Sequence, residues 1–161
     1  MLLREYRESD AEEIEAVYRN SILGIASGVY DRDQIRAWSS SFEDRLEPFR
    51  KLLSLDWTWV AVEVSDENSD IVAFGQLSPA DRIAFLFTDR RFSRRGYATE
   101  VYQKLESISR DRGTQCLRTE ASRISKYFFL KQGFRLLEPE LVIRRGVLIE
   151  RFKMLKSLSR E

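Results

Sequence analysis

IAFLFTDRRFSRRGYATEVYQKLESISRDRG, residues 83–113, is the stretch of sequence that decides the fold. Its apolar start, 83–88, is typical of a buried strand, and an arginine-rich turn with one glycine, 89–96, follows. An amphipathic helix comes next, with Gly113 as its C-terminal stop. A tight turn between a strand and a helix leaves free backbone N–H groups and the positive end of the helix dipole at one place. The sequence therefore predicts a phosphate cradle there.

Length and composition indicate a soluble globular protein with one domain, residues 1–161. A chain of this size buries roughly 70% of the surface that its unfolded form exposes. The 27 basic and 26 acidic residues leave a net charge of +1. Bulk attraction to nucleic acid or to a membrane is therefore not expected. No apolar run approaches the ~20 residues of a membrane helix, and we expect neither a signal peptide nor an anchor.

The chain has no histidine and one cysteine, Cys116. Zinc sites built on imidazole, Ser-His-Asp triads and Cys-His pairs are thereby excluded, and we expect no metal. A single cysteine rules out an internal disulfide framework and fits a reducing, cytoplasmic location. Because Cys116 lies in an apolar-leaning stretch, 115–121, we expect it to be buried and inert. Proton transfer must then use carboxylates, tyrosine, water or backbone.

The first third of the chain is predicted to be mainly helical. After a strand over 2–7, Ser9 begins an S-x-x-E capping box for a helix whose inner residues recur at helical spacing: Ile14, Val17, Tyr18 and Ile22. Asp31, with Gln34 three residues later, caps a short helix that carries Ile35 and Trp38. A further helix is expected from about Glu43 to Leu55, with Pro48 in its first turn or at a kink.

From Trp57 onward the hydrophobic period changes to two. The segments 57–64, 71–78 and 83–88 predict an antiparallel meander of three strands. After the helix that ends before Gly113, the strand 115–121 must run parallel to its predecessor, because a helix intervenes. Ser122 can cap a last helix with inner residues Tyr127, Phe128 and Leu130. The segments 134–143 and 147–154 form a closing hairpin, and the last few residues are expected to be disordered.

This order predicts an α+β protein with a mixed sheet and helices on both faces. The pairing switches from antiparallel to parallel at the strand that holds Phe85, Leu86 and Phe87. Neighbouring strands can splay at such a switch, and the crevice can accept an extended ligand. The phosphate cradle is expected at the mouth of that crevice.

The order and four motifs together resemble the GNAT N-acetyltransferases over almost the whole chain. Residues 93–98, Ser-Arg-Arg-Gly-Tyr-Ala, match the family's pyrophosphate loop at Gly96 and Ala98, with Ser93 where Gln or Arg is usual. Residues 128–134 match its Phe-Tyr-x-x-x-Gly-Phe pattern except that Phe129 replaces the tyrosine. The tail 145–154 is similar to the family's closing hairpin, and 30–38 resembles a substrate-side segment of one bacterial branch of uncertain substrate.

The resemblance implies a GNAT-like three-layer sandwich with its sheet splayed at the central strand. It also implies acetyl-CoA as cofactor and direct acetyl transfer to a primary amine of a small molecule or peptide. Glycine at 96 would let the backbone approach the pyrophosphate. The backbone of the splayed strand would pair with the pantetheine arm and supply an oxyanion donor. The residues so assigned to the cofactor are Leu86, Phe87, Thr88, Arg94, Arg95, Gly96, Tyr97, Ala98, Thr99 and Phe128.

Acid–base and acceptor residues are harder to assign. The family's tyrosine often protonates the leaving thiolate, which Phe129 cannot do; Tyr127 is the nearby hydroxyl, with core packing as its alternative use. Candidates for the general base are Glu120 first, then Glu63 and Asp89, each of which can equally form a surface salt bridge. Strand register decides which carboxylate faces the crevice. The segment 22–38 is expected to line the side of the crevice where the acceptor amine binds. Its predicted substrate-binding residues are Ser27, Tyr30 and Trp38.

Three alternatives stay open at this point. Phe129 and Ser93 fit a catalytically idle module that binds or senses acyl-CoA. The arginines at 90–95 also fit a nucleic-acid contact or a solvated surface, although the balanced net charge favours a phosphate-binding turn. The acceptor itself is not specified by the sequence. A homodimer formed through the closing hairpin also stays open.

Overall fold

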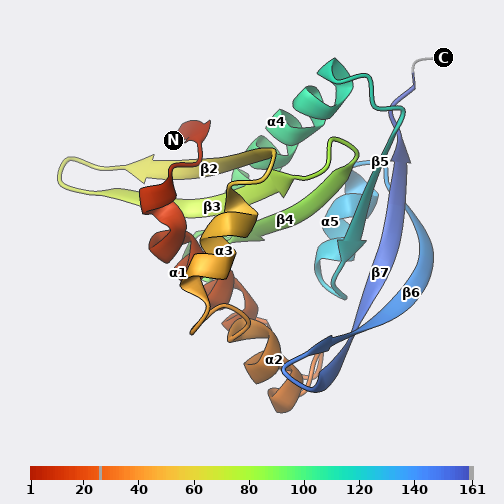
Figure 1. Ribbon diagram of the computed structural model, residues 1–161, viewed down its shortest axis with the longest axis horizontal. Helices are drawn as coiled ribbons and strands as arrows, with labels where there is room; N and C mark the ends of the chain where they lie inside the picture. Colours follow the sequence, from red (N-terminus) through yellow and green to blue (C-terminus); the bar gives the residue numbers. More distant parts are fainter. Residues whose placement is uncertain (26, 160–161) are drawn as a thin grey trace.

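The computed structural model describes residues 1–25 and 27–159, so the expectation for the last few residues falls partly outside this range, at 160–161. Within the described residues, seven strands form one mixed sheet in the order β1-β2-β3-β4-β5-β7-β6 (Figure 1). The strands are β1 (Leu2–Glu5), β2 (Trp57–Val64), β3 (Ser69–Leu77), β4 (Arg82–Thr88), β5 (Cys116–Ala121), β6 (Arg135–Arg144) and β7 (Val147–Ser157). The expected meander β2-β3-β4 is confirmed, as is the parallel pairing of β5 with β4.

Helices cover both faces of this sheet. They are α1 (Ala11–Leu23), α2 (Arg32–Ser39), α3 (Leu46–Leu53), α4 (Tyr97–Asp111) and α5 (Ser125–Lys131), with short 3-10 turns η1 (Glu8–Asp10) and η2 (Arg90–Phe92). The Asp31–Gln34 capping box of α2 is confirmed. Pro48 lies in the first turn of α3, and Gly113, in the left-handed region, follows Arg112, the C-cap residue of α4.

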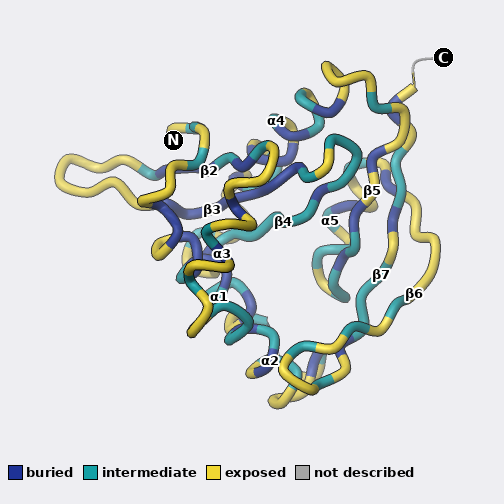
Figure 2. Tube along the Cα trace, in the orientation of Figure 1, coloured by how far each residue is buried: buried dark blue, intermediate teal, exposed yellow. Residues whose placement is uncertain are grey.

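Two hydrophobic cores lie on opposite faces of the sheet. One packs α1 and α3 against β2 and β3 through Ile14, Tyr18, Phe49 and Phe74. The other packs α4 and α5 against the opposite face through residues that include Val101, Leu105, Leu117 and Phe129. Figure 2 shows β3 buried along most of its length between them. The three-layer arrangement agrees with the fold expected from the sequence.

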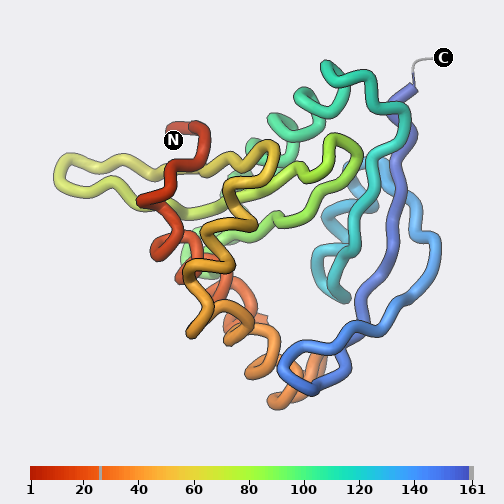
Figure 3. Tube along the Cα trace, in the orientation of Figure 1, coloured from red at the N-terminus to blue at the C-terminus, as the bar shows by residue number. Residues whose placement is uncertain are grey.

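The sheet opens between β4 and β5. These strands pair only at Arg82 with Arg118 and at Ile83 with Thr119. The Thr119 hydroxyl also donates to the Ile83 carbonyl at 2.9 Å, which holds the two strands together at the last paired position. A β-bulge at Ala84 disturbs the pairing of β4 with β3 at the same level. Beyond it the traces diverge (Figure 3), as the sequence predicted for this switch point.

Three local predictions are wrong. Ser9 does not cap α1: it lies within η1, and the Asp10 carboxylate accepts the Arg7 N–H there instead. Cys116 is exposed, because alternation along β5 turns Leu117, rather than Cys116, toward the core. On α5 the buried residue is Phe129, whereas Tyr127 and Leu130 are 61% and 44% exposed.

Candidate active site

The open edge of β4 carries unpaired backbone groups. The Asp89 N–H donates to the Val72 carbonyl at 2.8 Å, so the backbone of Asp89 faces β3. Because ladder bonds alternate along an antiparallel strand, the backbone of Phe87 also faces β3, and that of Leu86 and Thr88 faces away from it. Of the three residues expected to pair with a ligand, Leu86 and Thr88 therefore offer free N–H and C=O groups on the splayed side.

The turn after β4 is held in shape from within. Asp89 is 2% exposed, and its carboxylate accepts the Arg91 N–H at 2.9 Å and both ends of the Arg91 guanidinium at 3.1 Å. Burial alone would raise the pKa of Asp89, but the hydrogen bonds from Arg91 and from Asn20 outweigh burial and hold that pKa below its usual range. Asp89 thus fixes the turn, which leaves Arg90, Arg94 and Arg95 without an ion pair among the described residues.

Backbone geometry makes the turn concave. Arg94 has φ +62° and Gly96 has φ +85°, so two left-handed residues flank Arg95. Gly96 is the N-cap of α4, and nothing lies within 4 Å of the place where its Cβ would be. Successive amides in such a conformation converge on one point and can surround an anion.

Six consecutive amides of this turn are free. The first helical bond of α4 runs from the Glu100 N–H to the Gly96 carbonyl at 3.1 Å. Within the part of the chain that the structure describes, no N–H of residues 94–99 donates a hydrogen bond to another backbone group or to a side chain. Free N–H groups at the start of a 15-residue helix form an anion site, because the helix dipole adds its positive end.

A cavity of about 570 Å³ runs from this turn into the opening between β4 and β5. Residues 83–88 form one wall, and Thr119, Glu120, Ser122 and Ser125 form the other. Ser93 and Arg94 connect it to the cradle, and Trp38 closes it on the side of α2. Of the residues that line it, Glu120 alone carries a carboxylate. The splay thus joins an anion cradle to a single acid–base group.

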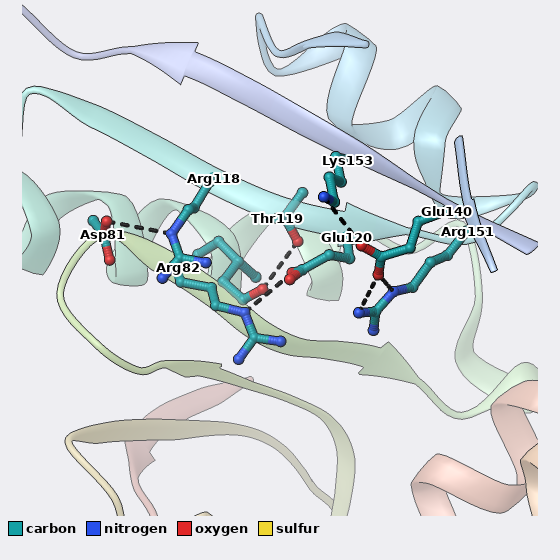
Figure 4. A network of polar contacts seen from close by, with 9 residues as sticks. Asp81, Arg82, Arg118, Thr119, Glu120, Glu140, Arg151 and Lys153 are labelled. Atoms are coloured by element: carbon teal, nitrogen blue, oxygen red, sulfur yellow. Dashed lines mark hydrogen bonds and ion pairs between the residues drawn. The ribbon is translucent and has the colours of Figure 1, made fainter. Parts of the chain in front are cut away.

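Glu120 lies at the point where β5 leaves β4. Its Oε2 accepts the Arg82 Nε–H at 3.1 Å, and its side chain is 17% exposed. Figure 4 shows Arg82 and Arg151 on either side of this carboxylate. Oε1 has no hydrogen-bond partner among the described residues. Glu120 is therefore anchored through one oxygen while the other can exchange a proton.

The other two carboxylate candidates lie elsewhere. Glu63, on β2, accepts a hydrogen bond from the Tyr97 hydroxyl, which raises the pKa of that tyrosine, and it does not line the 570 Å³ cavity. The Asp89 carboxylate is occupied by its hydrogen bonds with Arg91 in the turn. Strand alternation, which the sequence left undecided between these residues, thus brings only Glu120 to the crevice.

The aromatic residues of α5 are arranged differently from the prediction. Phe129 lines the cavity and packs against Tyr102 and Phe134. Tyr127 lies in a separate surface groove, with the Lys126 ammonium over its ring. Phe128 packs against Tyr102 and does not line the cavity. The structure therefore brings no tyrosine hydroxyl from α5 to the cavity.

The three acceptor-side residues have different surroundings. Tyr30 is 3% exposed; its hydroxyl donates to the Glu150 carbonyl and accepts the Arg123 N–H, both at 2.9 Å, and burial raises its pKa. Trp38 packs edge-on against Tyr30 and lines the cavity. Ser27 is exposed and lies outside it. Tyr30 thus ties the segment before α2 to β7, and Trp38 is the residue that reaches the crevice.

Several residues at the site were not singled out from the sequence. Ser125 is one of them: it exchanges hydrogen bonds with Ser122 just before α5, and both serines line the cavity. The N-cap residue of α5 is Ile124 rather than the predicted Ser122. Arg82, the partner of Glu120, lies 38 positions away in sequence. No local pattern links the two, although pairing of the parallel strands places them together once the register is known.

Comparison with known proteins agrees with this geometry. The sequence profile of the acetyltransferase (GNAT) family matches residues 13–134, well over half of the chain. The protein belongs to the GNAT acetyltransferase family. Acetyl-CoA is the cofactor of this family, and the free amides of residues 94–99, together with the open edge of β4, fit its pyrophosphate and pantetheine groups.

Individual relatives align with this protein over nearly the full length of both chains. The protein is 28% identical over 153 residues to the "uncharacterized N-acetyltransferase YafP" of Escherichia coli strain K12, with 94% of this chain and 93% of that one covered. A GCN5-related N-acetyltransferase from Rhodopseudomonas palustris superimposes with a TM-score of 0.90 at 28% identity, over 98% and 95% of the two chains. PaiA N-acetyltransferase from Thermoplasma acidophilum, solved with coenzyme A, shares the fold at a TM-score of 0.70 and 18% identity, over 97% and 98%.

One further expectation concerns membranes. Among the described residues, no helix is long and apolar enough to cross a bilayer.

Proposed function

We propose that this protein is an acetyl-CoA-dependent N-acetyltransferase that acts on a primary amine of a small molecule or peptide. The observation that carries the proposal is the set of six free amides, residues 94–99, at the mouth of a cavity that contains one carboxylate, Glu120. A phosphate cradle joined to an acid–base group is what acetyl transfer to an amine requires.

Residues of the turn and of β4 would hold the cofactor. The amides of residues 94–99 would donate to the pyrophosphate oxygens, and the guanidinium groups of Arg94 and Arg95, which form no ion pair among the described residues, would add positive charge beside them. The backbone of Leu86 and Thr88 would pair with the pantetheine amides as an added strand does. When bound, acetyl-CoA supplies an acetyl group activated as a thioester.

Glu120 would accept the proton that the amine must lose. An amine arrives mostly protonated at neutral pH, and its lone pair becomes nucleophilic only after deprotonation, directly or through water. The free Oε1 of Glu120 takes that proton while Oε2 stays with Arg82. The new bond joins the amine nitrogen to the acetyl carbon, and the bond between that carbon and sulfur breaks. The Leu86 N–H would donate to the carbonyl oxygen where negative charge develops.

The leaving thiolate needs no dedicated acid in this scheme. A free thiol has a pKa of about 8.5, so the thiolate is a tolerable leaving group and takes its proton from water. Phe129 supplies apolar packing beside it in place of a hydroxyl. Activity is therefore compatible with phenylalanine at this position, although a rate below that of relatives with tyrosine is expected.

Release of free CoA thiol, followed over time with acetyl-CoA and a panel of primary amines, tests the proposal. Steady release that depends on an amine, with an acetylated product of the expected mass, supports it. Saturable acetyl-CoA binding without amine-dependent release would instead support a catalytically idle acyl-CoA-binding module, which Phe129 in the cavity wall favours as the second candidate.

A further inference from the structure

A second cavity, of about 450 Å³, lies on the other side of Phe85 from the cradle. We call it the arginine vestibule, because five arginines line it: Arg45, Arg82, Arg144, Arg145 and Arg151. Of the described residues, no aspartate or glutamate lines it. The chain as a whole has 27 basic and 26 acidic residues, so this concentration of one charge is local.

The vestibule forms between the closing hairpin and the helical layer. The tip of the hairpin formed by β6 and β7 lies beside α2 in Figure 1, and the Arg145 side chain reaches from it to the loop between α2 and α3. There the Arg145 guanidinium donates to the Ser40 carbonyl at 3.0 Å and pairs with Asp44. Those contacts fix the outer wall, so the cavity is built by the fold rather than by a loose surface.

Ion pairs neutralise only three of the five arginines. Arg82 pairs with Glu120, Arg145 with Asp44, and Arg151 with Glu140. Arg45 is exposed and has no carboxylate partner among the described residues. Arg144 has none either, and its side chain donates only to the Ile143 carbonyl, at 3.3 Å. Arg144 is half-buried. Its guanidinium is therefore available to an anionic ligand.

The vestibule communicates with the catalytic carboxylate. A smaller cavity of about 100 Å³ is lined by Glu120, Arg144 and Arg151, and Ala84 and Phe85 line this cavity, the vestibule and the 570 Å³ cavity alike. A short molecule could therefore place an amine at Glu120 and an anionic group at Arg144.

We infer that the acceptor amine carries an anionic group, a carboxylate or a phosphate, and that Arg144 is the residue that recognises it. The planar guanidinium offers two parallel N–H donors to either group. The inference rests on the proposed acetyl transfer and names its substrate class. Arg45, which also has no carboxylate partner among the described residues, would add positive charge nearby, and the apolar rings of Tyr18 and Phe85 would contact the carbon chain between the two polar ends.

A kinetic test compares matched amines that differ only in charge: β-alanine with β-alaninamide, and O-phosphoethanolamine with ethanolamine. The ratio of kcat/KM within each pair is measured for the wild type, for Arg144→Gln and for the control Arg135→Gln. Arg135 begins the same strand, β6, is exposed and has no ion pair among the described residues. Comparing ratios between variants cancels the intrinsic basicity of each amine.

We expect the wild type to favour the anionic member of at least one pair. Arg144→Gln should raise KM for that member about tenfold or more, with little change in kcat or in the neutral member. Arg135→Gln should leave the ratio within about twofold of the wild type. The pair that responds identifies carboxylate or phosphate as the group. Equal preference for neutral and anionic amines would overturn the inference, as would equal losses in both variants.

A binding test requires no turnover. N-acetylglycine, N-acetylglycinamide and inorganic phosphate are titrated calorimetrically into the protein without acetyl-CoA. Saturable binding of N-acetylglycine or phosphate that Arg144→Gln weakens about tenfold, and that Arg135→Gln retains, supports the vestibule even if no amine is acetylated; in that case only the proposed transfer fails. If Arg144→Gln weakens the binding of neither anion, and neutral amines are turned over, the vestibule is rejected and acetyl transfer is left standing.

Discussion

Glu120 is held by Arg82 through Oε2, and its Oε1 has no partner among the described residues. We assign Glu120 as the base because one oxygen positions the carboxylate and the other is free to accept a proton. The sequence offered Glu120, Glu63 and Asp89 as candidates, with Glu120 first, because strand register decides which carboxylate faces the crevice. The hydrogen-bond partners separate them: Glu63 is engaged by Tyr97, and Asp89 by Arg91.

We expect Glu120→Gln to lower kcat about 10²- to 10⁴-fold, the usual contribution of a positioned general base. Acetyl-CoA affinity should stay within about twofold, because the cradle residues are untouched. Glu138→Gln is the control, since Glu138 forms an exposed ion pair with Lys153 and lies outside the cavity. Steady-state kinetics together with calorimetry separate the two quantities. An unchanged kcat in Glu120→Gln would remove Glu120 from the mechanism.

Helix α4 packs closely against the sheet at Gly75 of β3. An added Cβ there would lie 2.8 Å from Val101 Cγ1, 2.9 Å from Leu105 Cδ1 and 3.1 Å from the Phe85 carbonyl oxygen. These distances are too short for ordinary contact, so the helix sits as close as a glycine permits. The position of α4, and with it the direction of its free N–H groups, depends on this contact.

Gly75→Ala should therefore destabilise the fold by about 1–3 kcal/mol, the cost of overpacking a well-filled core. Ser69→Ala, at the exposed start of the same strand, should change stability by less than about 0.5 kcal/mol. Urea denaturation of both variants measures the difference. Equal stability of Gly75→Ala and the wild type would mean that α4 can move away from β3 without cost.

The turn between β4 and α4 has a pH dependence of its own. Because the pKa of Asp89 is lowered in the folded state, its contribution to stability is complete above its unfolded pKa of about 3.9 and is lost as the pH falls through the lower folded value. We expect Asp89→Asn to reduce the free energy of unfolding by about 1 kcal/mol at pH 7. The gap from the wild type should shrink below about pH 4. Denaturation at pH 7 and at pH 3 tests this; a gap that is constant with pH would contradict it.

For the whole molecule, the order of elements was predictable because hydrophobic periods and capping residues are local signals. The switch to parallel pairing at β4 followed from the helix between β4 and β5, and the cradle followed from the turn 89–96. Boundaries moved by a few residues, as at β7, which extends to Ser157.

Other features depend on distant contacts and could not be predicted. In α5, four consecutive residues, 127–130, are aromatic or apolar, so a helix of seven residues gives no clear periodicity. Contact with Tyr102 and Phe134 selects Phe129 as the buried one. The arginine vestibule likewise collects residues from the segments around 45, 82 and 144–151. Only the folded hairpin brings these together.

The central claim is that the turn at the start of α4 holds the pyrophosphate of acetyl-CoA. Calorimetric titration of acetyl-CoA into the wild type, Gly96→Glu and Gly113→Glu tests it most directly. Gly96 and Gly113 flank the two ends of α4, have φ of +85° and +80°, and both have open space where a Cβ would lie, so both variants carry similar backbone strain. Only Gly96 adjoins the six free amides. We predict saturable binding by the wild type and by Gly113→Glu, and a loss of at least about tenfold in affinity for Gly96→Glu, because its carboxylate would repel the pyrophosphate. No binding by the wild type, or equal affinity in Gly96→Glu and Gly113→Glu, would contradict the account.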